Sequence, residues 1–143
     1  MNLIVKLSTL SVAMLLLFSC STAPQKKPPE KAGVNLQKEF SQAQIDSAAG
    51  GKAKADTRLK KIVHSHPTTD VASDANMMMG KIYYEAREFA NAYTAFIAIV
   101  NSEVFSPSEG EALLWASRSL MRLGRADEAL SLTQKSAKIP GLS

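Results

Sequence analysis

The chain lacks the means to cross-link itself, because Cys20 is its only cysteine. No disulfide can therefore form within one chain. Residues 36–143 are nevertheless long enough to make one small domain. We expect that domain to be held together by the burial of apolar side chains.

The sequence also lacks the patterns that catalysis or cofactor binding requires. It contains no nucleophile paired with a base, no glycine-rich phosphate loop and no paired-carboxylate motif. His64 and His66 offer two metal ligands, but no acidic or cysteine cluster accompanies them. The methionines at 77–79 point in different directions on a helix, which favours core packing over a copper site. We therefore expect no enzymatic activity, no metal and no cofactor.

Neither sign of charge dominates the chain, which has 17 basic and 13 acidic residues. The basic residues are scattered, and no aromatic platform for base stacking lies among them. A nucleic-acid-binding surface normally shows both features on one face or helix. The sequence therefore predicts no nucleic-acid partner.

No apolar run is long enough to cross a bilayer as a lasting anchor. The longest one, near residues 10–18, follows a short polar start that contains Lys6. A short apolar run of this kind, close to the amino terminus, is typical of a signal segment. We assign residues 1–19 to that segment.

The signal segment ends in the letters LFSC, of which the last is Cys20. This ending resembles the lipobox of bacterial lipoproteins, and the resemblance implies cleavage before Cys20 and lipid attachment to its thiol. The alternatives are an ordinary secretory signal with an incidental cysteine and a cysteine thiol buried in the core. Ser21, where an aspartate would favour the inner membrane, implies by the same resemblance an outer-membrane location facing the periplasm.

Residues 20–35 are rich in proline and lysine and contain almost no apolar side chain. Such a composition predicts a flexible, extended tether between the lipid and the folded part. Its lysines could contact anionic head groups, although a solvated linker is the simpler interpretation.

The stretch of residues 73–106 carries apolar side chains at helical spacing in two runs. The pattern breaks between the runs at Ala86, Arg87 and Glu88, where a short turn would let the chain double back. The sequence therefore predicts two antiparallel helices that bury their stripes against each other.

Small and aromatic residues in this stretch follow the offsets of a tetratricopeptide repeat, which the stretch resembles. They are Gly80, Tyr83, Ala92 and Phe96. Gly80 and Ala92 allow two backbones to approach, while Tyr83 and Phe96 fill the space beside them.

The resemblance extends to both sides of this stretch. In residues 110–143 the packing and turn positions are Ala116, Gly124 and Ala129. Residues 36–69 are a degenerate copy with a turn at Gly50-Gly51, unless the stable fold starts near Ala53. The resemblance implies an all-α fold in which antiparallel helix pairs stack as a short right-handed solenoid.

The first helix of each clear pair has a face that points away from its core stripe, and these faces form the candidate partner-binding groove. Its residues are Met77, Lys81, Tyr84, Glu85, Leu114, Arg118 and Arg122. Tetratricopeptide arrays bind peptides on this surface, so the resemblance implies a protein or peptide ligand. Lys81, Arg118 and Arg122 favour an acidic segment, with Tyr84 as an apolar anchor.

Tetratricopeptide arrays usually end in an extra helix that covers the last apolar stripe, and the sequence stops directly after the third repeat. We therefore expect Leu130, Leu132 and Ala137 to be partly uncovered. Self-association would cover them, as would the rest of a longer protein. Similarity to repeat lipoproteins implies an adaptor that joins envelope proteins in outer-membrane assembly or cell-wall synthesis. The alternative is an amino-terminal module of a longer lipoprotein whose remaining part binds a ligand or acts on the cell wall.

Overall fold

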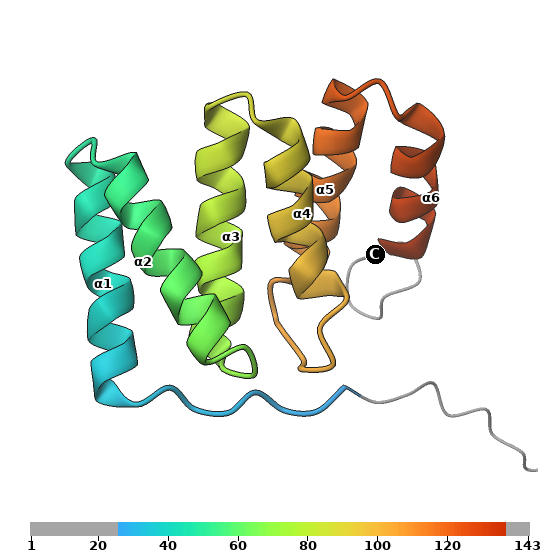
Figure 1. Ribbon diagram of the computed structural model, residues 1–143. Helices are drawn as coiled ribbons and strands as arrows, with labels where there is room; N and C mark the ends of the chain where they lie inside the picture. Colours follow the sequence, from blue (N-terminus) through green and yellow to red (C-terminus); the bar gives the residue numbers. More distant parts are fainter. Residues whose placement is uncertain (1–25, 137–143) are drawn as a thin grey trace, which may run out of the picture.

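The computed structural model describes residues 26–136, which form six α-helices in sequence (Figure 1). The helices are α1 (Val34–Ala48), α2 (Lys52–Ser65), α3 (Asp70–Glu85), α4 (Phe89–Val100), α5 (Glu109–Arg122) and α6 (Ala126–Ser136). The predicted signal segment, Cys20 and Ala137 lie outside the described residues. The prediction of an all-α fold is confirmed.

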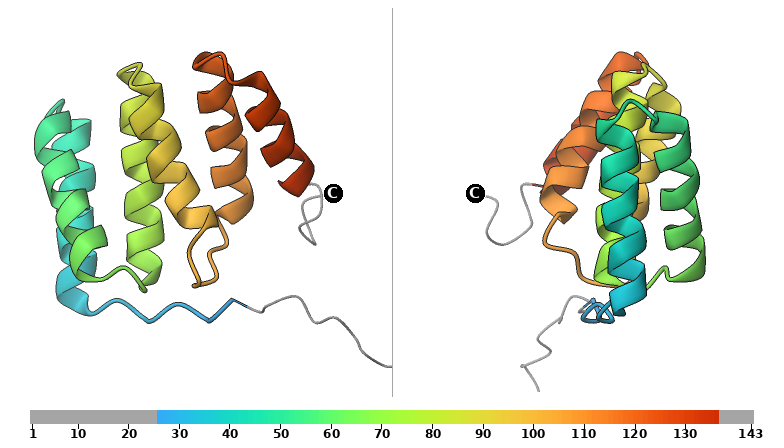
Figure 2. Two further views of the ribbon diagram at one scale, coloured as in Figure 1. Left: turned by 45° about the vertical axis from the view of Figure 1, so that its right-hand side comes forward. Right: turned by 90° about the vertical axis from the view of Figure 1, so that its left-hand side faces the viewer.

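The helices stand side by side in one row of three pairs, as the views in Figure 2 show. Each helix packs against the next one along the chain, and α1 also touches α3, as α3 touches α5. Each of the predicted segments 36–69, 73–106 and 110–143 covers most of one pair, although the first helix of each pair begins one to three residues before the predicted start. The domain is therefore a repeat-like stack in which each pair helps to bury the next.

The turns inside the three pairs share one geometry. Gly50, Arg87 and Gly124, spaced 37 residues apart, have φ values of 83°, 63° and 75°. The residue after each donates its N–H to a carbonyl five residues earlier, at 2.8 to 2.9 Å. This left-handed residue with its closing hydrogen bond is the usual way to end a helix tightly. The first segment therefore turns in the same way as the two clearer ones.

Two clusters of buried side chains fill the spaces between the helices. The first cluster contains residues of the four helices from α1 to α4, and the second contains residues of the four helices from α3 to α6. The packing positions named from the sequence that are buried are Gly80, Ala92, Phe96, Ala116 and Ala129. Tyr83 is half-buried, contacts both clusters and donates a hydrogen bond from its hydroxyl to Asp56 on α2. These side chains therefore tie neighbouring helix pairs together.

The closest approach in the core is between Gly80 on α3 and Phe96 on α4. A Cβ atom added to Gly80 would lie 2.4 Å from Cε1 of the Phe96 ring. Real Cβ atoms do not come that close to a carbon, so no other residue fits at position 80 without movement. Glycine is therefore required here for packing and not for its backbone freedom.

The first pair places a carboxylate where the other pairs have Tyr83 and Leu120. Asp46 is buried and accepts hydrogen bonds from Arg58 Nε at 2.8 Å and from Gln42 Nε2 at 3.3 Å, while Lys54 Nζ lies 3.2 Å away. Burial acts to raise the pKa of Asp46, but these three partners outweigh it and hold the pKa below its usual value. Charge pairing thus connects α1 to α2.

Residues 26–33 do not form the free tether that their composition suggests. They run along the loops that join the helix pairs, below the ends of the helices in Figure 1. Lys27 exchanges backbone hydrogen bonds with Glu103 and Phe105, and Glu30 does so with Thr68 and Asp70. Backbone N–H and C=O groups in these loops need hydrogen-bond partners, and residues 26–33 supply them. The composition of the segment does not reveal this pairing.

A side chain adds to this attachment. Lys26 Nζ lies 2.8 Å from Glu109 Oε2 and donates to the carbonyl oxygen of Val100 at 2.7 Å. Val100 is the last residue of α4, where unpaired carbonyls favour a cation. Lys26 therefore links the end of α4 to the start of α5.

We predict that Gly80→Ala lowers the free energy of unfolding by about 1–3 kcal/mol, because the added methyl group meets the Phe96 ring. Gly80→Leu should prevent stable folding. Urea denaturation followed by circular dichroism measures both effects. Gly33→Ala is the control, since no atom lies within 4 Å of its added methyl group. Replacing Phe96 by Leu in Gly80→Ala should recover part of the loss, and an unchanged midpoint for Gly80→Ala would refute the close contact.

Asp46 predicts a specific dependence of stability on pH. Because its pKa in the folded state is lowered, its contribution is complete above the unfolded pKa of about 3.9 and is lost as pH falls through the folded value. Asp46→Asn should therefore be less stable than the native chain at pH 7, and the difference should shrink below about pH 4. Urea titrations at several pH values test this, with the exposed Glu103→Gln as control. A difference that grows toward low pH contradicts the assignment.

Candidate functional site

A shallow groove of about 430 Å³ lies between α5 and α6, next to the end of α3. Its lining residues are Tyr84, Leu114, Ser117, Arg118, Met121, Arg122, Ala126, Ala129, Leu130 and Thr133. Three large apolar side chains on its walls are open to solvent: Leu114 is 50% exposed, Met121 61% and Leu130 60%. A group of exposed apolar side chains beside basic ones is typical of a protein-binding surface.

Four of the seven residues expected in the partner-binding groove do line it. They are Tyr84 on α3 and Leu114, Arg118 and Arg122 on α5. The prediction from the sequence covered only the first helix of each pair and did not include the α6 wall. It treated the uncovered end of the chain as a separate surface, whereas the structure joins the two.

Met77 is not on this face, contrary to expectation. Its side chain is 7% exposed and belongs to the second core cluster. Helical spacing within α3 does place Met77 away from Met79 and Ile82. That side of α3 is nevertheless covered, because α5 packs against α3 as well as α4. Met77 is therefore a core residue.

Lys81 and Glu85 are not among the lining residues of the groove. Lys81 Nζ lies 2.9 Å from Glu111 Oε1 on α5, and Glu85 Oε2 lies 2.7 Å from Lys52 Nζ on α2. The Lys81 ammonium group and the Trp115 indole N–H lower the pKa of Glu111 by hydrogen bonding to it. Both charges therefore serve contacts between helix pairs.

Aromatic side chains form the α3 side of the groove. Tyr84 meets Phe89 and Trp115 edge to face, with ring centroids 5.2 Å apart in both cases. Trp115 also stacks on Phe96 at 5.9 Å. Tyr84 is therefore a half-buried wall of the groove, held in place by its ring contacts, and its role as an apolar anchor for a ligand stays a prediction.

Two guanidinium groups lie at the edge of the groove. Arg118 lies 5.0 Å from the centre of the Trp115 ring, and Arg122 lies 4.8 Å from that of Phe89. Among the described residues, neither arginine forms an ion pair with a carboxylate. The aromatic rings hold both cations in place, and their charge remains available to a ligand.

Of the residues expected to be partly uncovered near the end of the chain, Leu130 is exposed and Leu132 is not. Leu130 faces the groove and is exposed, whereas Leu132 is buried in the second core cluster. The two side chains point to opposite sides of α6 because they are two positions apart on a helix. Ala137 lies outside the described residues.

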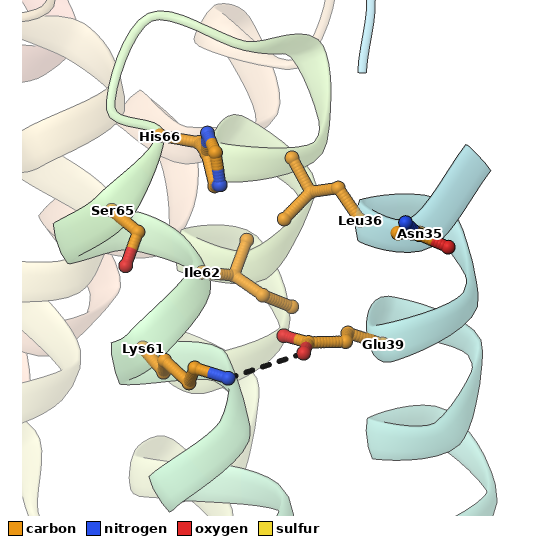
Figure 3. Close-up of a pocket in the computed structure, with 7 residues that line it drawn as sticks. All are labelled: Asn35, Leu36, Glu39, Lys61, Ile62, Ser65 and His66. Atoms are coloured by element: carbon orange, nitrogen blue, oxygen red, sulfur yellow. Dashed lines mark hydrogen bonds and ion pairs between the residues drawn. The ribbon is translucent and has the colours of Figure 1, made fainter. Parts of the chain in front are cut away.

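A second, smaller pocket lies between the start of α1 and the end of α2 (Figure 3). Leu36, Ile62 and His66 contribute to its walls, and Lys61 Nζ pairs with Glu39 Oε1 across it at 3.1 Å. Its volume of about 130 Å³ is well below the size of typical ligand pockets. The groove between α5 and α6 is therefore the stronger candidate.

The remaining features named from the sequence do not gather into a site. His64 and His66 are exposed at the end of α2. Within residues 26–136, no three potential metal ligands lie close enough together to hold an ion. None of the helices in this part of the chain combines the length and the apolar composition that a membrane span requires.

Comparisons with protein-family models, with curated proteins and with solved structures found no match to this chain.

Proposed function

We propose that this chain is a lipid-anchored adaptor of the bacterial outer membrane that faces the periplasm and binds an envelope protein through the α5–α6 groove. It acts by binding and not by catalysis. The observation that carries the proposal is the groove itself, in which exposed Leu114, Met121 and Leu130 lie beside Arg118 and Arg122. Apolar contact supplies the affinity for a partner, and the two cations select one with acidic side chains.

The amino-terminal sequence supports the membrane part of the proposal. The motif that ends at Cys20 resembles a lipobox, and Lys26, six residues further on, is bound to Val100 and Glu109. The chain between Cys20 and Lys26 is so short that it spans at most about 20 Å when fully extended. A lipid on Cys20 would therefore keep the loop between α4 and α5, on which Lys26 and Lys27 lie, near the membrane.

A mutation at Cys20 tests the lipid anchor. We expect the native chain to incorporate labelled palmitate and to sediment with the outer membrane, and Cys20→Ser to appear in the soluble periplasmic fraction. Two or more acyl chains are needed for stable anchoring, which is why loss of the thiol should release the protein. A native chain that is soluble and unlabelled would remove the anchor from the proposal.

Crosslinking in living cells tests the adaptor role. A photoreactive residue in place of Leu114, and another in place of Arg118, should each capture the same envelope protein, identified by mass spectrometry. The matched control is a photoreactive residue in place of Ala98, which is exposed on α4 away from the groove. Equal capture from Ala98, or no capture from the groove, contradicts the proposed function.

A further inference from the structure

The repeat-like stack contains a second copy of the surface that forms the groove. Positions 77, 80 and 84 of α3 correspond, at a spacing of 37 residues, to 114, 117 and 121 of α5. The same spacing relates α4 to α6. In the first copy, α5 packs over the α3–α4 face and buries Met77. Among residues 26–136, no helix packs over the corresponding α5–α6 face, and Leu114 is half-exposed at the equivalent position.

The two faces differ in the size of their side chains. Where α4 carries Phe89, Tyr93 and Phe96, the equivalent positions of α6 carry Ala126, Leu130 and Thr133. All three α6 residues line the groove, so the loss of aromatic rings accounts for its hollow. Ser117, at the position equivalent to Gly80, has a buried hydroxyl without a hydrogen-bond partner among the described residues.

The helix that covers the first face shows what would fit the second. α5 presents fully buried Ala112 and Ala116 to the second cluster, where the aromatic Phe96 leaves little room. A helix on the α5–α6 face meets alanine, leucine and threonine and has room for large side chains of its own. Small and large residues alternate across well-packed interfaces in this way.

The charges follow the same correspondence. Lys81 pairs with Glu111 across the contact of α3 with α5. Arg118 occupies the position equivalent to Lys81 and has no carboxylate partner among the described residues. An incoming helix would supply that carboxylate, and Arg122 offers a second cation one turn away.

We propose that the groove binds one amphipathic helix of a partner protein, placed on α5–α6 as α5 is placed on α3–α4. Large apolar side chains of that helix fill the hollow beside Ala126 and Thr133, and a carboxylate pairs with Arg118. This inference rests on the proposed partner-binding role, but it does not depend on the lipid anchor.

A second copy of the chain is a poorer occupant. In a head-to-tail stack, α1 of the next copy would cover the groove. The residues of α1 equivalent to Ala112 and Ala116 are Lys38 and Gln42. Burying the charged Lys38 side chain against the apolar wall of the groove is unfavourable, and large polar Gln42 would stand where α5 has an alanine.

The probe that tests the proposal is a labelled, hydrocarbon-stapled helical peptide with the sequence of residues 109–122 and the changes Ala112→Leu and Ala116→Phe. It keeps the acid at position 111 and adds the two large side chains that the hollow calls for. Fluorescence anisotropy with the purified protein measures its binding. The unaltered peptide should bind at least about tenfold more weakly, and a Glu111→Gln version of the probe several-fold more weakly.

Two protein variants locate the binding site. Ala126→Phe places in the groove the ring that α4 carries at Phe89, and it should abolish probe binding without lowering the melting temperature. Ala98→Phe adds the same ring on the exposed side of α4 and should bind the probe like the native chain. Arg118→Glu should weaken binding by roughly tenfold.

Other outcomes overturn the proposal. If the groove does not accept a helix, the probe will not bind, or it will bind the Ala126→Phe variant as tightly as it binds the native chain. A dimer that forms with increasing concentration and is lost in Ala126→Phe identifies a second copy as the occupant. If groove crosslinking captures an envelope protein through a proline-rich, extended segment, the proposed function stands and the helical ligand is refuted.

Discussion

The contact of Gly80 with the Phe96 ring is the constraint on which the middle of the domain depends. Because Gly80 has no side chain, α3 and α4 can approach closely, and the Phe96 ring is completely buried. Phe96 in turn supports Trp115 by stacking, and Trp115 holds Arg118 over its ring. A packing contact in the core thus fixes the position of a cation at the edge of the groove, about two helices away in sequence.

The other two pairs show what happens when this contact is changed. Ala43 and Leu59 occupy the equivalent positions in the first pair, where the ion pairs of Asp46 add a link between α1 and α2. In the third pair the positions hold Ser117 and Thr133, and a hollow remains. One backbone plan therefore yields a polar end, a tightly packed centre and an open groove, according to the size and charge of a few side chains.

Spacing within the sequence predicted the helix pairs and the turns near Gly50, Arg87 and Gly124, because these depend on neighbours along the chain. It placed Met77 on an open face, since a helical period gives direction but does not say which later helix will cover it. The composition of residues 26–33 indicated a free tether, because composition does not show which backbone groups of distant loops will form hydrogen bonds with a segment. The α6 wall was missed because the hollow arises from the absence of rings that α4 has.

The amino-terminal segment and the groove meet on one helix. Glu109, the first residue of α5, pairs with Lys26, and Leu114, Arg118 and Met121 of the same helix line the groove. α5 also packs between α4 and α6 and buries one face in the second cluster. Because α5 is held along its length by the core, a ligand in the groove contacts a rigid element that is directly joined to the segment leading toward Cys20. A flexible linker would have left the orientation of the groove relative to that segment undefined, whereas the hydrogen bonds of Lys26 and Lys27 fix the position of these two residues beside α4 and α5.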